Sequence, residues 1–465
     1  MVFSSLTFLC IFLPLVFLGH TLLPSMRLKN GLLIVASLLF YAYGEPIYVL
    51  LMFASTVANW AFGRALGSSE DKQKRRIILG AAVVLNLAFL AVFKYASMFV
   101  MNINAILPLA LPDPQIALPI GISFYTFQAM SYIIDVYRGQ VQAQKSYPRV
   151  LLYISFFPQL IAGPIVKYHD IENQLVERHA TLEDIALGLR RFCVGLAKKV
   201  LIANTMAVTV DSLFSADPSS VNVLVAWLAA IAYVLQIYFD FSGYSDMAIG
   251  MARMFGFHFK ENFCYPYAAT SIKEFWRRWH ISLSTWFKEY LYIPLGGNRH
   301  GRFRTVFNKL IVFFLCGLWH GAAWTFVVWG LIHGFFLLLE EYIPIRKLPK
   351  PLGWLYTLLV VTVAFVLFRA DTFAQGGLFI QQMFSGFHFE YASTALFMRQ
   401  LNPVFVVTLF VALFAALPIA PCLKERFGER HELRVVSFVA SLVLLGVCIL
   451  ALSGGGYNPF IYFRF

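Results

Sequence analysis

Residues 311–339 read IVFFLCGLWHGAAWTFVVWGLIHGFFLLL, a stretch without Asp, Glu, Lys or Arg that still contains two histidines, His320 and His333. As one helix, its 29 residues would be roughly 43 Å long, well beyond a hydrocarbon core of about 30 Å. Its glycines offer places where the chain can bend or where helices can pack closely. The stretch therefore indicates a membrane element with ionisable groups at depth.

The composition of the whole chain agrees with a membrane protein. Its 465 residues are 59% hydrophobic and only 13% charged, whereas soluble proteins carry about 25% charged residues. Apolar runs near or above the roughly 20 residues that span a bilayer recur along the chain. They cover residues 6–23, 77–100, 221–239, 352–367, 404–417 and 435–452. The predicted fold is all-α: a single polytopic membrane domain over residues 1–465, with about 10–12 transmembrane or re-entrant helices.

Several local features narrow this prediction. The N-terminal run lacks the basic region and small-residue cleavage site of a secretory signal, so we interpret it as a retained first span. Pro and Gly interrupt the apolar pattern at 44–46, 119–121 and 158–164. The six cysteines form no CxxC pair and the histidines lack metal-ligand spacing. We therefore expect no metal and no permanently bound cofactor.

The net charge of +13 is unevenly distributed. Residues 251–309 hold ten Lys or Arg and three Glu, which favours a cytoplasmic, interfacial and re-entrant segment attracted to anionic lipid head groups. A sharper hypothesis adds an anionic, nucleotide-bearing acyl carrier as ligand. Nucleic acid is not an expected partner, because no recognisable nucleic-acid-binding motif accompanies the charge.

The basic connectors create a conflict in the predicted topology. By the positive-inside rule, connectors 64–76, 190–199 and 346–350 are cytoplasmic, as is 251–309. The stretch quoted above must then enter and leave the membrane on one side. Either it is a long tilted helix and one assignment is wrong, or it is a broken, partly re-entrant element. Both versions place His320 in the interior, since irregular backbone at depth is tolerated only inside protein or beside a wet cavity.

Ionisable groups at membrane depth are costly, which makes His320 a functional candidate. A neutral imidazole between the bulky rings of Trp319 and Trp324 suits general-base work near neutral pH. The alternative is a histidine that hydrogen-bonds between helices. His333 points about 220° away around a regular helix, so we interpret it as a packing or interhelical hydrogen-bonding residue. Residues 310–340 are the predicted catalytic histidine segment.

A second candidate group lies in KEFWRRWHISLSTWFKEYLYIPLGGNR, residues 273–299. Its tryptophans and basic residues combine an aromatic belt with a basic face, as at a membrane interface. His280 is placed to turn toward the interior, and Trp279, Arg277 and Arg278 beside it are candidate substrate contacts. The alternative is a purely interfacial segment.

A third candidate group lies in QIYFDFSGYSDMAIG, residues 236–250. Asp240, Ser242 and Tyr244 are candidate substrate contacts, as one polar wall of a substrate tunnel. The alternative is a buried hydrogen-bonded cluster that orients helices. Asp240 and Asp246 need partners near the end of an apolar run, and we expect downstream arginines to supply them.

Together with LPIGISFYTFQAMSYIIDVYRG and FPQLIAGPI earlier in the chain, these motifs resemble the membrane-bound O-acyltransferases. They are most similar to the bacterial branch with the alginate O-acetylation membrane subunit and the teichoic acid D-alanine exporter. The resemblance runs nearly the full length, with the motifs in the same order. It implies a ring of helices around a thin central layer with a funnel, His320 as the essential histidine at its centre and His280 as a supporting one.

The resemblance also implies a function. An acetyl group would move from a cytoplasmic thioester, most simply acetyl-CoA, across the bacterial inner membrane to O-acetylate an extracellular polysaccharide of alginate or cellulose type. His320 would act as general base, in a passage walled by Trp319, Trp324 and the Asp240–Tyr244 stripe. The expected partners are an extracytoplasmic acetyltransferase protein, the polysaccharide acceptor and membrane lipids.

Other functions stay open at this point. Peptidoglycan O-acetylation and D-alanyl transfer to teichoic acid use the same motifs. A transporter of an acylated substrate and an inert scaffold are the non-enzymatic alternatives. Repeated halves and several intramembrane carboxylates, which would favour a transporter, are weak in this sequence.

Overall fold

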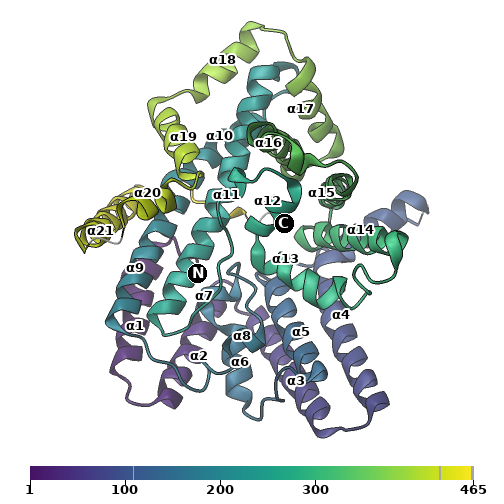
Figure 1. Cartoon of the computed structure of the whole chain (residues 1–465), viewed down its shortest axis with the longest axis vertical. Coiled ribbons are helices and arrows are strands. Elements are labelled where there is room, and N and C mark those ends of the chain that lie inside the picture. The colour runs from purple at the N-terminus through teal and green to yellow at the C-terminus, as the bar shows by residue number, and fades with distance from the viewer. Residues whose placement is uncertain (108, 429–430, 462–465) are drawn as a thin grey trace. The chain divides into compact units, whose positions relative to one another are not determined.

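The computed structural model describes residues 1–107, 109–428 and 431–461, and helices make up most of this part of the chain, with no strand in it (Figure 1). Seven of the described helices are long and apolar enough to cross a membrane, or eight if the bent pair α18–α19 forms one span. The predicted all-α, polytopic fold is therefore confirmed. The chain forms two compact units. They are Met1–Phe192 with Met247–Lys260, and Cys193–Asp246 with Glu261–Phe465.

The first unit contains α1 to α8. Their bounds are α1 (Leu13–Leu22), α2 (Met26–Ala42), α3 (Tyr48–Ser68), α4 (Lys72–Ile106), α5 (Ile122–Arg138), α6 (Tyr147–Ser155), α7 (Phe157–Leu160) and α8 (Tyr168–Ile171). The Pro and Gly interruptions predicted at 44–46 and 119–121 separate α2 from α3 and precede α5. Gly121 adopts φ 78°, a left-handed conformation that favours glycine, directly before α5 begins.

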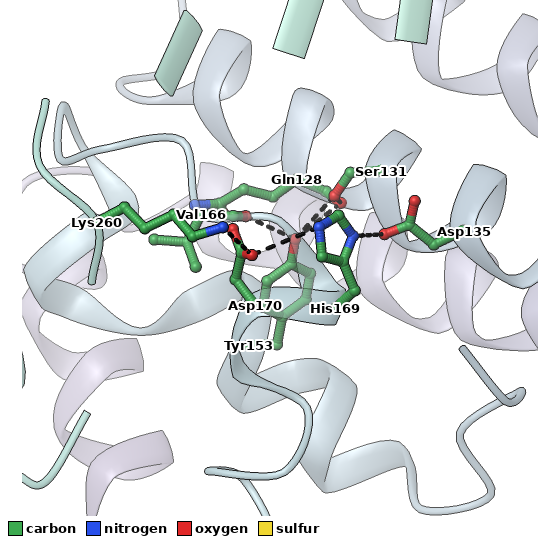
Figure 2. A network of polar contacts seen from close by, with 8 residues as sticks. All are labelled: Gln128, Ser131, Asp135, Tyr153, Val166, His169, Asp170 and Lys260. Carbon is green, nitrogen blue, oxygen red and sulfur yellow. Dashed lines mark hydrogen bonds and ion pairs between the residues drawn. The ribbon is translucent and has the colours of Figure 1, made fainter. Parts of the chain in front are cut away.

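Buried polar pairs hold the helices of the first unit together. Asn59 on α3 and Asn86 on α4 exchange amide hydrogen bonds of 3.2 and 2.8 Å. Figure 2 shows a second network, in which His169 Nδ1 on α8 lies 2.8 Å from Asp135 Oδ2 on α5. This hydrogen bond raises the pKa of His169. Such interhelical polar contacts are a common means of packing helices in membranes.

The second unit carries most of the remaining helices. They are α10 (Asn204–Phe214), α12 (Ile272–Arg278), α13 (Ile281–Phe287), α14 (Gly301–His320), α15 (Trp324–Tyr342), α16 (Lys350–Arg369), α17 (Phe373–Ser385), α18 (Tyr391–Gln400), α19 (Pro403–Ala415), α20 (Ile419–Phe427) and α21 (His431–Ser453). Helices α9 (Leu182–Ala197) and α11 (Val223–Met254) each contribute residues to both units.

The segment 190–199, predicted as a cytoplasmic connector, lies inside a continuous helical stretch from Leu182 to Phe214. Its two lysines are held in ion pairs, with 2.6 Å between Lys198 Nζ and Asp246 Oδ2 and 2.9 Å between Lys199 Nζ and Asp240 Oδ1. The segment is therefore part of a helix and not a loop between helices, and two of its basic residues are partnered by acidic side chains of α11.

The stretch that opened the sequence analysis is a broken helical hairpin. Helix α14 ends at His320, the backbone is extended at Gly321, and α15 returns antiparallel to α14. The two helices pack closely at glycines, since a Cβ placed on Gly330 would lie 3.2 Å from Gly317 Cα. An ion pair between Lys309 and Glu341 joins them at the end away from the break. The hairpin therefore enters and returns at one end, which resolves the predicted conflict in favour of the broken element.

Candidate active site

His320 is the last residue of α14, at the tip of the α14–α15 hairpin. Its side chain is buried among aromatic rings, with ring centroids 5.1 Å from Trp319, 5.1 Å from Trp329 and 5.3 Å from Phe368. The imidazole borders a cavity of about 10 Å³, which gives room for about one water molecule. Its lining residues are Ile237, Phe241, Trp279, His320, Trp329, Phe365 and Phe368.

The structure brings the two candidate catalytic histidines together. The ring centroids of His280 and His320 lie 6.4 Å apart, although they belong to different elements. His280 is fully buried at the junction of α12 and α13, and it packs edge-on against Phe241 with centroids 4.5 Å apart. Its backbone adopts φ 42°, which is unusual for a residue with a side chain and costs energy.

Asn262 holds the turn that positions His280. Its carbonyl oxygen accepts a 2.9 Å hydrogen bond from the Ile281 amide, and its side-chain oxygen accepts from the Ser282 amide and hydroxyl at 3.1 and 2.8 Å. The Asn262 amide donates in turn to Ser245 Oγ on α11 at 2.9 Å. No sequence pattern points to Asn262, because it lies in a connector without a recognisable motif.

The other predicted site residues of α12, α14 and α15 differ in their surroundings. The ring centroid of Trp319 lies 5.9 Å from that of His280, and Trp279 lines the small cavity at His320. Trp324 begins α15 and is 48% exposed. Arg277 is exposed, and Arg278 is paired with Glu274 one helical turn away at 2.8 Å.

The Asp240–Tyr244 stripe of α11 is buried, and its side chains contact Lys199 and the C-terminal residues Phe460 and Ile461. Asp240 pairs with Lys199 at 2.9 Å and accepts a 2.8 Å hydrogen bond from the Ile461 amide. The Tyr244 ring stacks on Phe460, with centroids 4.7 Å apart, and Ser242 is buried beside them in the sequence. The described ion pairs of Asp240 and Asp246 are thus with upstream lysines, whereas the sequence pointed to downstream arginines. The paired lysines of an apolar helix were the signal that sequence reasoning missed.

A larger cavity of about 470 Å³ lies beside the hairpin. Its basic side chains Lys273 and Lys288 are exposed, whereas its walls Trp276 and Cys316 are buried. The full lining comprises Lys273, Trp276, Ser284, Phe287, Lys288, Tyr292, Asn298, Thr305, Lys309, Val312, Phe313, Cys316, Leu337 and Glu341. The cavity therefore runs from a basic rim to an apolar floor. Its volume is typical of a ligand-binding site, for which about 300–1,000 Å³ is usual.

Among the described residues, no group of three His, Cys, Asp or Glu side chains is arranged to hold a metal ion. A helical membrane domain with one histidine at the tip of a hairpin and a second histidine whose ring centroid lies 6.4 Å away, next to a basic cavity with an apolar floor, has groups that suit acyl transfer. The basic rim suits an anionic donor, and an imidazole suits proton removal from an alcohol.

Comparison with known proteins identifies the family. The model of the membrane-bound O-acyltransferase family matches residues 140–370, which include both histidines and the hairpin. The chain is 40% identical to the probable alginate O-acetylase AlgI of Azotobacter vinelandii, with all of both chains aligned. The chain belongs to the membrane-bound O-acyltransferase family and is an acyltransferase.

Two further relatives show the breadth of the similarity. The peptidoglycan O-acetyltransferase of Helicobacter pylori is 33% identical, over 100% of this chain and 98% of the relative. The teichoic acid D-alanyltransferase of Bacillus subtilis is 28% identical, over 53% of this chain and 65% of the relative.

Proposed function

We propose that this protein moves an acetyl group from a cytoplasmic thioester, most simply acetyl-CoA, across the inner membrane for O-acetylation of an extracellular polysaccharide of alginate type. The observation that carries the proposal is the pairing of His320 with His280 at the hairpin tip, 6.4 Å between ring centroids. Full-length similarity to the probable alginate O-acetylase supports the choice of acceptor. Cellulose-type polymers offer the same hydroxyl chemistry.

The cavity of about 470 Å³ beside the hairpin is the binding site that we propose for the thioester, and we call it the donor cavity. Its three lysines, Lys273, Lys288 and Lys309, belong to the basic segment 251–309, whose charge favours the cytoplasmic side. They attract the phosphates of an anionic carrier, while the apolar floor accepts the uncharged acyl end. The Glu341 carboxylate is paired with Lys309 and leaves the rim basic.

The proposed reaction is a single acyl transfer. The oxygen of an acceptor hydroxyl attacks the thioester carbonyl carbon, and His320 takes the hydroxyl proton as general base. A C–O bond forms as the C–S bond breaks, and the thiolate leaves as CoA after it takes the proton from the imidazolium. His280 is the supporting histidine, held in place by Asn262. The acceptor hydroxyl belongs either to the polymer or to a partner protein.

We propose an extracytoplasmic acetyltransferase as that partner, which completes delivery to the polymer. Peptidoglycan is the second candidate acceptor, because the peptidoglycan O-acetyltransferase relative also aligns over the full length. D-alanyl transfer ranks third, since the teichoic acid D-alanyltransferase aligns over only 53% of this chain. For each of these acceptors, a donor supplied from the cytoplasm fits a protein of the inner membrane.

Replacement of the proposed base tests the function in cells. The change His320→Ala should leave membrane insertion intact but reduce the acetyl content of the secreted polymer at least about 100-fold, the usual range for loss of a general base. The matched control is His300→Ala, which removes an exposed histidine before α14. Polymer acetyl esters are measured by NMR, alongside the amount of protein in the membrane. Normal acetylation by the His320→Ala variant would show that another group is the base.

A further inference from the structure

Aromatic rings fill the space between the two cavities of the second unit. Trp276 lines the donor cavity and Trp329 lines the small cavity at His320. The centroids of the two indole rings lie 5.9 Å apart, and the Trp329 ring lies 5.1 Å from His320. Two successive ring contacts therefore connect the donor cavity to the proposed base.

These rings carry hydrogen-bonding groups that the protein does not use. Among the described residues, the indole N–H groups of Trp276 and Trp329 have no hydrogen-bond partner, and neither do the two ring nitrogens of His333. Trp276 is 8% exposed and the other two are at most 1% exposed. His333 packs against both tryptophans, with centroids 5.2 and 5.0 Å away. Buried indole N–H groups usually have a partner, so this cluster calls for an explanation.

We propose that Trp276 and Trp329 form a gate between the donor cavity and His320, which opens for the acyl end of the donor and restricts transfer to short acyl groups. The inference rests on the proposed function, since it assumes that the thioester occupies the donor cavity. The gate explains both observations. The rings fill the route to His320, and their N–H groups are donors for the carbonyl oxygen of an acyl group that passes between them.

Space decides which acyl groups the gate admits. The cavity at His320 has a volume of only about 10 Å³, so even an acetyl group requires the indoles to shift. Protein interiors are close-packed, and each added methylene requires a larger displacement of neighbouring side chains. Trp276 is the ring to alter, because Trp329 also packs on His320. Removal of the Trp276 indole should open the route to longer chains.

The acyl-length profile of transfer tests the gate. Membranes that contain the complete acetylation system are supplied with acetyl-CoA, propionyl-CoA or butyryl-CoA, and kcat/KM is measured for each donor. In the Trp276→Ala variant, the butyryl-to-acetyl ratio should rise about tenfold or more, because each methylene in an apolar pocket changes discrimination by at least that factor. Trp276→Leu should shift the ratio in the same direction by less.

The control is Trp286→Ala, which also removes a buried tryptophan but one that lines neither cavity. It should keep the wild-type ratio. A wild-type ratio in folded Trp276→Ala or Trp276→Leu overturns the gate and leaves the proposed function standing. Equal use of butyryl-CoA and acetyl-CoA by the wild-type protein overturns the gate without any variant. Absence of transfer from every acyl-CoA in wild-type membranes instead overturns the proposed function.

Discussion

At the residue scale, His280 has a strained backbone conformation and lies beside His320 in the candidate site. Its φ of 42° lies in the left-handed region, which costs an L-residue with a side chain about 1–2 kcal/mol. The amides of the next two residues, Ile281 and Ser282, donate hydrogen bonds to Asn262 and hold this conformation in place. Strained residues persist where the surrounding structure determines them, and they gather at functional sites. The imidazole is therefore retained here at the expense of stability.

A pair of substitutions separates the backbone strain from the side chain. Both His280→Gly and His280→Ala should lose most acyl transfer, because the imidazole near His320 is gone. The Gly variant should nevertheless be more stable than the Ala variant by about 1 kcal/mol, since glycine adopts positive φ without strain. Thermal unfolding in detergent measures the difference.

The exposed His300, with φ −111°, provides the comparison for that pair. There glycine should give less stability advantage over alanine than at His280, because φ is negative and lies outside the left-handed region. Equal stability of the two His280 variants would mean that the turn is not strained. Full activity in either variant would mean that His280 has no part in the reaction.

At the element scale, the hairpin depends on close contact between α14 and α15. Gly→Ala in a helix normally stabilises it by up to about 1 kcal/mol. At Gly330 the same change should destabilise the protein by about 1–3 kcal/mol, because the new methyl group meets Gly317 and the Phe313 backbone oxygen. It should also lower acyl transfer, since displacement of α15 moves Trp329 away from His320.

Gly446 on α21 is the matched position, because a Cβ there meets no atom within 4 Å. Gly446→Ala should therefore leave the thermal unfolding temperature unchanged or raise it. Purified variants are compared by unfolding temperature and by transfer rate. An unfolding temperature for Gly330→Ala equal to that of Gly446→Ala would contradict the close packing of the hairpin.

The α14–α15 hairpin was predictable from the sequence only in part. Its length, glycines and basic flanks predicted either a tilted helix or a broken one, and only the antiparallel packing of α14 on α15 decides between them. The helical conformation of 190–199 was not predictable for a related reason. Local charge does not reveal an ion pair such as Lys199–Asp240, whose members are far apart in sequence.

At the scale of the whole molecule, composition and hydropathy were enough to predict the all-α membrane fold. The candidate site was only partly predictable. His320 and His280 stood out as ionisable residues in apolar surroundings, and the structure places them side by side. Asn262 did not, because a positioning residue is defined by three-dimensional contacts and has no sequence pattern of its own. The lysines of the donor cavity stood out only as members of the basic segment 251–309, and the sequence does not show which of them line a cavity.

The proposed acetyl transfer is vectorial, with the donor on one face of the membrane and the acceptor on the other. Inside-out membrane vesicles that carry the complete system expose the cytoplasmic face to the medium. Labelled acetyl-CoA is added outside, and ester-bound label on the polysaccharide inside the vesicles is the direct measurement. Wild-type vesicles should accumulate label, and His320→Ala vesicles should accumulate at least about 100-fold less. Equal label in both, or none in wild-type vesicles, would contradict acetyl transfer through His320.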